Sequence, residues 1–124
     1  MTLTINFPMP PNLINGKLAK LHWRVKLRAK DGYWALLDGL QMTKRLPPPP
    51  KVPLDRVGLS SAIVNRNLMD DDNAIARHKH LLDWLVTRGY LVDDKRPHVR
   101  WLGIPEQRIS RKEPASITLT LTPE

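Results

Sequence analysis

Asp70, Asp71, Asp72 and Asn73 are consecutive, and they form the segment of this chain best suited to binding a divalent cation. If the segment is extended, residues two apart point to the same side, so Asp70 and Asp72 converge while Asp71 points away. Two carboxylates about 4 Å apart repel by roughly 1 kcal/mol in water and by about 4 kcal/mol at an effective dielectric of about 20. A converging pair therefore favours a bound cation. The alternative is that Asp71 or Asp72 simply caps the helix expected next, a position where Asp is preferred.

Two further groups could take part in the same site. Lys79 lies seven residues after Asp72, close to two helical turns, so a helix would place it above Asp72. An ammonium group there can contact a scissile phosphate, stabilise charge developing on it or protonate a leaving oxygen. The alternative is a solvated lysine on an exposed helix edge. A second acidic pair, Asp93 and Asp94, supplies a third carboxylate, although the sequence does not establish whether Asp94 returns to the first cluster.

The chain as a whole is strongly basic. It carries 20 Lys and Arg against 12 Asp and Glu, for a net charge of +8. This balance favours a polyanionic partner, either nucleic acid or an acidic membrane surface. The candidate phosphate contacts are Lys17, Lys20, Arg24, Arg28 and Arg66. Solvated side chains are the alternative for part of this set. One Phe and two Tyr give little support to an RNA-binding role, which would need an aromatic stacking strand.

Length and composition limit the number of domains, the type of metal ligand and the expected localisation. A chain of 124 residues fits one domain but not a catalytic domain with a separate DNA-binding domain, so one surface must do both jobs. The sequence has no cysteine, and its four histidines lack the spacing of a zinc site. Carboxylates therefore remain as metal ligands, and they select Mg²⁺, Mn²⁺ or Ca²⁺. No apolar run reaches the roughly 18 residues of a membrane helix and no signal-peptide pattern opens the chain, so we expect a cytoplasmic protein.

Hydrophobic periodicity predicts two helices. Apolar residues recur at roughly helical intervals over 21–45, although Asp31 and Gly32 could break this segment in two. The second helix, 74–88, is the clearer one, because its apolar residues fall on one arc and Gly89 can end it. Trp84 lies opposite this arc, so we expect it at a subunit interface.

Alternating or continuous apolar residues predict four strands, at 2–7, 56–65, 99–104 and 115–122. The strand 56–65 has apolar residues on both faces, which is typical of an interior strand covered on both sides. Proline-rich segments at 8–16 and 47–50 separate the elements. The order β-α-β-α-β-β predicts one α+β domain over residues 1–124, a small mixed sheet with two main helices packed on it.

These motifs together resemble the RusA family of Holliday junction resolvases, especially its phage-borne members. The order that carries the resemblance is Asp70-x-Asp72-Asn73, then Lys79 and Asp83, then Gly89-x-x-x-Asp93-Asp94. The opening is similar too: a strand leading into Phe7-Pro-Met-Pro-Pro-Asn12, followed by Leu21-His-Trp-Arg24. The resemblance covers nearly the whole chain, and the combination of motifs is more specific than DxDN alone.

The resemblance implies a crossover junction endodeoxyribonuclease of DNA recombination and repair. Such an enzyme is a homodimer that binds four-way junctions and cuts two strands symmetrically, using Mg²⁺, for which Mn²⁺ can substitute. Carried over, the metal ligands are Asp70, Asp72 and Asp94, and the basic catalytic residue is Lys79.

Two positions in this transfer have rivals. The match of Lys79 requires a longer spacing after Asn73 than in the best-known member of the family, and Arg77 is the alternative candidate for the basic catalytic residue. Asp93 would be the third metal ligand in place of Asp94 if the turn differs by one residue. A function from another class also stays open, namely a DNA-junction binding protein that does not cut.

Overall fold

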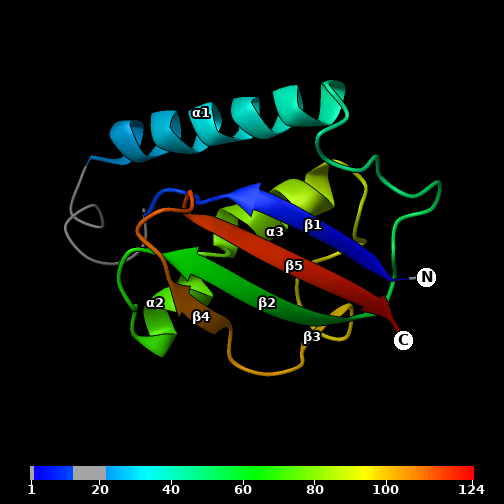
Figure 1. Cartoon of the computed structure of the whole chain (residues 1–124). Helices are drawn as coiled ribbons and strands as arrows, with labels where there is room; N and C mark the ends of the chain where they lie inside the picture. Colours follow the sequence, from blue (N-terminus) through cyan, green and yellow to red (C-terminus); the bar gives the residue numbers. More distant parts are fainter. Residues whose placement is uncertain (1, 13–21) are drawn as a thin grey trace.

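The computed structural model describes residues 2–12 and 22–124 of the chain. Within them the elements are, in chain order, β1 (Leu3–Pro8), α1 (Trp23–Met42), β2 (Val57–Asn65), α2 (Asp71–Ala76), α3 (Lys79–Thr87), β3 (Val99–Trp101), β4 (Glu106–Ile109) and β5 (Ser116–Pro123). They form one sheet with helices beside it (Figure 1), so the predicted α+β class is confirmed. No helix in the described ranges is both long enough and apolar enough to cross a bilayer.

The sheet is mixed, as predicted. β5 lies between β1 and β2 and is antiparallel to both, with Ile5 opposite Leu119 and Leu59 opposite Leu121. The other edge of β2 carries two short parallel strands in succession, because β3 pairs with the first part of β2 and β4 with the last part. β2 is therefore an interior strand, in agreement with the sequence.

The predicted strand 99–104 is shorter than expected, and β4 was missed. β3 ends at Trp101, and Gly103 and Pro105 then lead the chain away from the ladder before β4 begins. Proline cannot donate to a ladder, which explains the interruption. β4 lies at the sheet edge and is largely polar, so it has no alternation of apolar residues that would reveal a strand.

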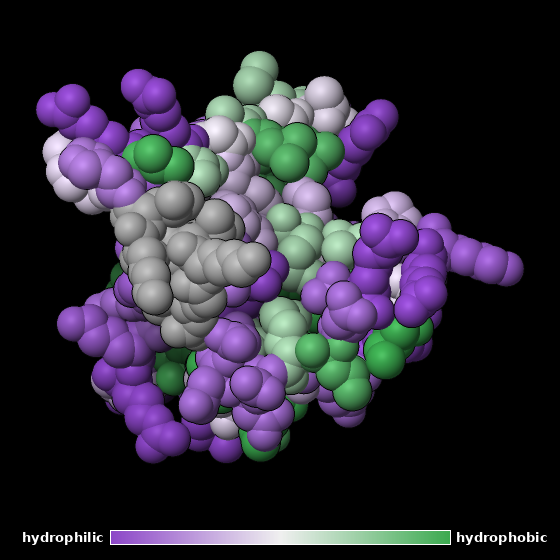
Figure 2. Space-filling model, turned by 90° about the vertical axis from the view of Figure 1, so that its left-hand side faces the viewer, coloured by the Kyte–Doolittle hydropathy of each residue, from purple (hydrophilic) through white to green (hydrophobic). Residues whose placement is uncertain are grey.

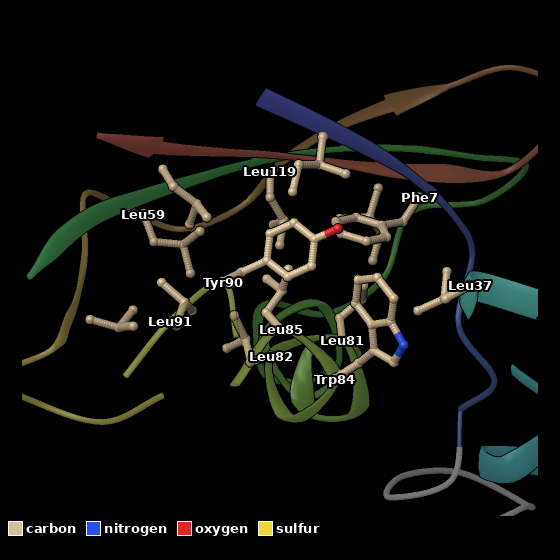
Figure 3. Packing of buried hydrophobic residues seen from close by; sticks show 14 of the residues in the cluster. Phe7, Leu37, Leu59, Leu81, Leu82, Trp84, Leu85, Tyr90, Leu91 and Leu119 are labelled. Atoms are coloured by element: carbon tan, nitrogen blue, oxygen red, sulfur yellow. The ribbon is translucent and has the colours of Figure 1, made fainter. Parts of the chain in front are cut away.

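The hydrophobic core lies on one face of this sheet. Side chains of β1, β2 and β5 point toward α3 and the segment after it, and Figure 3 shows Phe7, Leu59 and Leu119 above Leu85 and Tyr90. The expectation that β2 is covered on both faces is wrong. Residues Ser60 and Ala62, which point to the other face, are exposed, and in Figure 1 α3 lies behind the sheet while α1 lies beside its β1 edge.

The first helix is continuous through Asp31 and Gly32, so the suspected break does not occur. Gly32 faces open space, where its missing side chain leaves no packing defect. α1 is fixed to the rest of the chain by Tyr33, whose hydroxyl donates to the Pro8 carbonyl at 2.6 Å, and by the fully buried Leu37. Burial also raises the pKa of Tyr33, so the phenol stays neutral.

The second predicted helix is in fact two, because His78 interrupts it. Its backbone N–H donates to Ile75 O at 3.1 Å, and its ring nitrogen Nδ1 lies 2.7 Å from Ala74 O. A carbonyl only accepts, so Nδ1 carries the hydrogen and the imidazole takes the place of the backbone donor of a continuous helix. Nε2 is then left to accept from the Ser61 hydroxyl at 2.6 Å. Both helices face the same core, so the apolar spacing continues across the break and conceals it.

Trp84 is a core residue, and its predicted place at a subunit interface is wrong. Its side chain is 0% exposed and packs against Phe7 and Tyr90. Its indole N–H donates to Asp38 Oδ1 at 2.9 Å. α3 is covered by the sheet on one side and by α1 on another. A larger part of its circumference is therefore buried than in a helix with only one covered face.

Candidate active site

The acidic segment is held at the end of β2 by a side chain from β4. Gln107 Oε1 accepts from the Met69 N–H at 2.8 Å, and Gln107 Nε2 donates to Met69 O, also at 2.8 Å. One amide thus satisfies both backbone groups of the residue immediately before Asp70. Gln107 is a positioning residue that the sequence analysis missed, because a glutamine in a polar edge strand carries no recognisable signal.

Asp70 is the N-cap residue of α2, and Asp71 and Asp72 occupy its first turn. The backbone of Asp70 is extended, with φ −59° and ψ 152°, but its side chain makes no capping hydrogen bond. The expected capping by Asp71 or Asp72 is therefore not observed. The argument that Asp70 and Asp72 converge along an extended backbone is also wrong, since Asp72 is helical. All three carboxylates are exposed at a helix N-terminus, where the partial positive charge of the backbone favours anions.

Lys79, the first residue of α3, contacts two carboxylates. Its Nζ lies 3.3 Å from Asp83 Oδ1 and 3.6 Å from Asp94 Oδ2. Asp94 belongs to the loop 92–98 between α3 and β3, so this loop returns to the start of α3, a path that the sequence left open. The side chain of Lys79 is 54% exposed and that of Asp94 is 21% exposed. The result is an accessible ammonium group above a partly buried carboxylate.

Two opposing effects act on the pKa of Asp94. Burial raises the pKa of Asp94, hydrogen bonds with Asp93 and Asp83 raise it further, and the charge of Lys79 lowers it. The hydrogen bond to Asp83 raises the pKa of Lys79, with a smaller contribution from Asp94, so Lys79 is an ammonium ion at neutral pH. Asp83 and Asp94 thus both contact Lys79, while the hydrogen bond from the Asp94 backbone, together with the charges of Lys95 and His98, lowers the pKa of Asp93.

The rival residues have other contacts. Arg77 Nη1 donates to Pro10 O at 3.2 Å, which ties the proline-rich segment to the junction of α2 and α3. Its Nε is buried without a partner among the described residues, and burial lowers the pKa of Arg77. Asp93 Oδ1 accepts from the backbone N–H of Asp94 at 2.7 Å, so Asp93 shapes the turn that presents its neighbour.

Carboxylate oxygens are the donors that Mg²⁺ and Mn²⁺ prefer, and Asp83 and Asp94 present two such carboxylates beside Lys79. Within residues 2–12 and 22–124, no three His, Cys, Asp or Glu side chains are grouped so that they could hold a metal ion. The structure therefore brings together Lys79, Asp83 and Asp94, but it does not gather Asp70, Asp72 and Asp94 into one such group.

Three of the five predicted DNA contacts lie among the described residues. Arg24 and Arg28 are exposed and four residues apart on α1, so they share one face of the helix. Arg66 is exposed in the segment after β2. Lys17 and Lys20 fall outside the described residues. Figure 2 shows the end of the molecule where α1 begins, and hydrophilic side chains predominate there.

The sequence matches no known protein-family model, and no curated protein is similar to it.

Proposed function

We propose that this protein is a divalent-metal-dependent DNA endonuclease that resolves Holliday junctions and other branched DNA. The observation that carries the proposal is the contact of Lys79 with Asp94 at 3.6 Å. Motif order alone pairs these two residues, which lie 15 positions apart in the sequence. Arg77 and Asp93 have structural roles, which supports Lys79 and Asp94 as the functional pair.

The proposed metal ligands are Asp70, Asp72 and Asp94, which would have to come together when the metal binds, because they form no such group in the described residues. Asp70 and Asp72 present exposed carboxylates at the start of α2, and Asp94 contributes a carboxylate from the loop before β3. When bound, Mg²⁺ lowers the pKa of a water ligand and neutralises charge on the phosphate. Gln107 supports this arrangement indirectly, because it fixes the backbone just before Asp70.

Lys79 would act as a cation rather than as a base. Since its pKa is raised by Asp83 and Asp94, the amine keeps its proton at neutral pH. A fixed positive charge beside a scissile phosphate stabilises the negative charge that develops in the transition state. Asp83 holds the ammonium group from one turn further along α3, and it can release that group to a phosphate because both side chains remain solvent-accessible.

The preference for four-way junctions, the homodimer and the paired symmetric cuts rest on the resemblance to the RusA family. The net charge of +8 and the exposed Arg24, Arg28 and Arg66 support a nucleic-acid substrate. They bring DNA to a site that is itself acidic.

The alternative, a junction-binding protein that does not cut, is favoured by two features. Lys79 is engaged by two carboxylates, and the aspartates do not form a ready three-ligand group within the described ranges. One experiment separates the two functions: a labelled four-way junction and a matched linear duplex are incubated with the protein in Mg²⁺ or in EDTA. Paired nicks in the junction that require Mg²⁺, with the duplex intact, support the nuclease. Tight junction binding without cleavage in Mg²⁺ or Mn²⁺ supports the binding protein.

A further inference from the structure

Three arginines from separate parts of the chain line one open depression of about 390 Å³. Arg56 lies just before β2, Arg96 lies in the loop before β3, and Arg100 lies on β3. Pro97 and Glu124 complete the lining. This depression is at the end of the sheet where β2 begins and β5 ends, opposite the end where α2 lies in Figure 1.

The sheet register places two of these side chains on the same face. Val57 is fully buried in the core, so its neighbours Arg56 and Gly58 point to the other face, where Arg56 is exposed and Gly58 is covered by Leu102. Arg100 pairs directly with Gly58 and therefore points the same way. The Leu102 side chain occupies the space over Gly58, so a ligand would lie beside Arg100, against Arg56, Arg96 and Pro97.

The charges in this depression are only partly balanced. Glu124 accepts from Arg100 Nε at 3.2 Å and also from Nη2, which orients that guanidinium group. The side chains of Arg56 and Arg96 make no hydrogen bond or ion pair with any residue of the described chain. The lining holds three guanidinium groups and the side-chain carboxylate of Glu124, so positively charged side chains predominate in it. Repulsion among the arginines is relieved when an anion binds between them.

We propose that Arg56, Arg96 and Arg100 form a second binding site for the phosphodiester backbone of DNA, an inference that rests on the proposed function. A guanidinium group is planar, always charged and able to donate two parallel hydrogen bonds to phosphate oxygens. An open depression suits a polymer backbone, whereas a small free phosphate is usually enclosed.

The loop 92–98 connects this arginine site to the candidate active site. Arg96 follows Asp94 by two residues, so their Cα atoms lie at most about 7 Å apart. Asp94 faces Lys79 on α3, while Arg96 contributes to the depression at the sheet end. DNA held at the arginine site would therefore restrain the loop that carries the third candidate ligand.

The test measures binding in EDTA, so that its outcome does not depend on cleavage. The affinity for a fluorescent four-way junction is measured against salt concentration for wild type and for the variant Arg56→Gln/Arg96→Gln. The matched control, Lys44→Gln/Arg45→Gln, removes two exposed positive charges just after α1. Each lost phosphate contact makes the slope of log affinity against log salt less steep by about 0.9. We expect a change of about 1 to 2 for the arginine variant and none for the control.

Two further measurements identify the ligand. In wild type, the side-chain N–H signals of Arg56 and Arg96 should shift saturably in NMR spectra on addition of the junction. Arg56→Lys/Arg96→Lys should keep the slope but bind several-fold more weakly, because it keeps the charge and loses the paired hydrogen bonds. Equal slopes for the arginine variant and the control overturn the proposal. A response of these signals to inorganic phosphate but not to DNA also overturns it.

Discussion

Replacement of Asp38 by alanine should destabilise the fold by about 2 to 4 kcal/mol. Asp38 Oδ1 accepts from the Trp84 indole at 2.9 Å and from Arg88 Nε at 2.8 Å, and Oδ2 accepts from Arg88 Nη2 at 2.8 Å. Loss of the carboxylate leaves the N–H of a fully buried indole without an acceptor, at a cost of about 1 to 3 kcal/mol. The pair with Arg88 is about one-third exposed on each side and adds about 0.5 to 1 kcal/mol.

A conservative variant separates these two contributions. Asp38→Asn keeps an oxygen for the Trp84 indole and loses only the ion pair, so it should cost about 1 kcal/mol. In a Trp84→Phe background, which has no indole N–H, Asp38→Ala should also cost only about 1 kcal/mol. The free energies of unfolding come from urea titrations followed by circular dichroism, since Trp84 contributes to fluorescence. Equal losses for Asp38→Ala and Asp38→Asn, or no coupling to Trp84→Phe, would refute this reasoning.

The same contact has a defined pH dependence. The hydrogen bond from Arg88 lowers the pKa of Asp38 in the folded state. The stabilisation is therefore complete above the unfolded pKa of about 3.9 and is lost as the pH falls through the lower folded value. Asp38 lies on α1, so this contact also joins the helix that carries Arg24 and Arg28 to the helix that begins with Lys79.

Three further predictions concern the site and its support. Lys79→Met should abolish Mg²⁺-dependent cleavage yet lower the unfolding free energy by less than about 1 kcal/mol, because its ion pairs are largely exposed; retained cleavage, measured on a junction substrate, contradicts its role. Burial lowers the pKa of His78, so stability should be constant above about pH 6.5 and fall below it, where the unfolded chain binds more protons; urea titrations of His78→Gln should show a weaker decline, and an unchanged decline argues against this assignment. Gln107→Leu removes both bonds to Met69 and should raise the Mg²⁺ concentration for half-maximal cleavage; an unchanged Mg²⁺ titration would show that Gln107 does not position the site.

The sheet was predictable where burial imposes a pattern. Ile5, Phe7, Leu119 and Leu121 alternate with polar residues because only one face of the sheet meets the core. β4 was not predictable, since an edge strand with both faces largely polar carries no alternation. The open face of β2 was missed for the opposite reason: Ala62 is apolar but small, and its exposure has little cost.

The helices show what periodicity leaves out. The break at His78 depends on a side chain competing with its own backbone, which apolar spacing does not record. Trp84 was assigned to an interface because it departs from the main arc of α3, whereas α1 covers that side and Asp38 satisfies the indole. The path of α1 across α3 is a tertiary feature and cannot be inferred from either helix alone.

In the candidate site, the sequence identified residue types but not their arrangement. The choice of Lys79 and Asp94 depended on motif order, and their contact requires the loop 92–98 to return along α3. The relation between Asp70 and Asp72 was argued from extended backbone, but α2 begins one residue after Asp70. Local geometry at a strand-to-helix junction therefore decides which carboxylates can converge.

The most direct test of the central claim compares the junction cleavage rates of wild type, Asp70→Asn and Asp71→Asn at one Mg²⁺ concentration. Both variants remove one exposed carboxylate from the start of α2, and only Asp70 is a proposed metal ligand. Asp70→Asn should lower the rate by about 100-fold or more while junction binding in EDTA is retained, and Asp71→Asn should cut at close to the wild-type rate. Equal cleavage by all three proteins would contradict a metal-dependent nuclease site at Asp70.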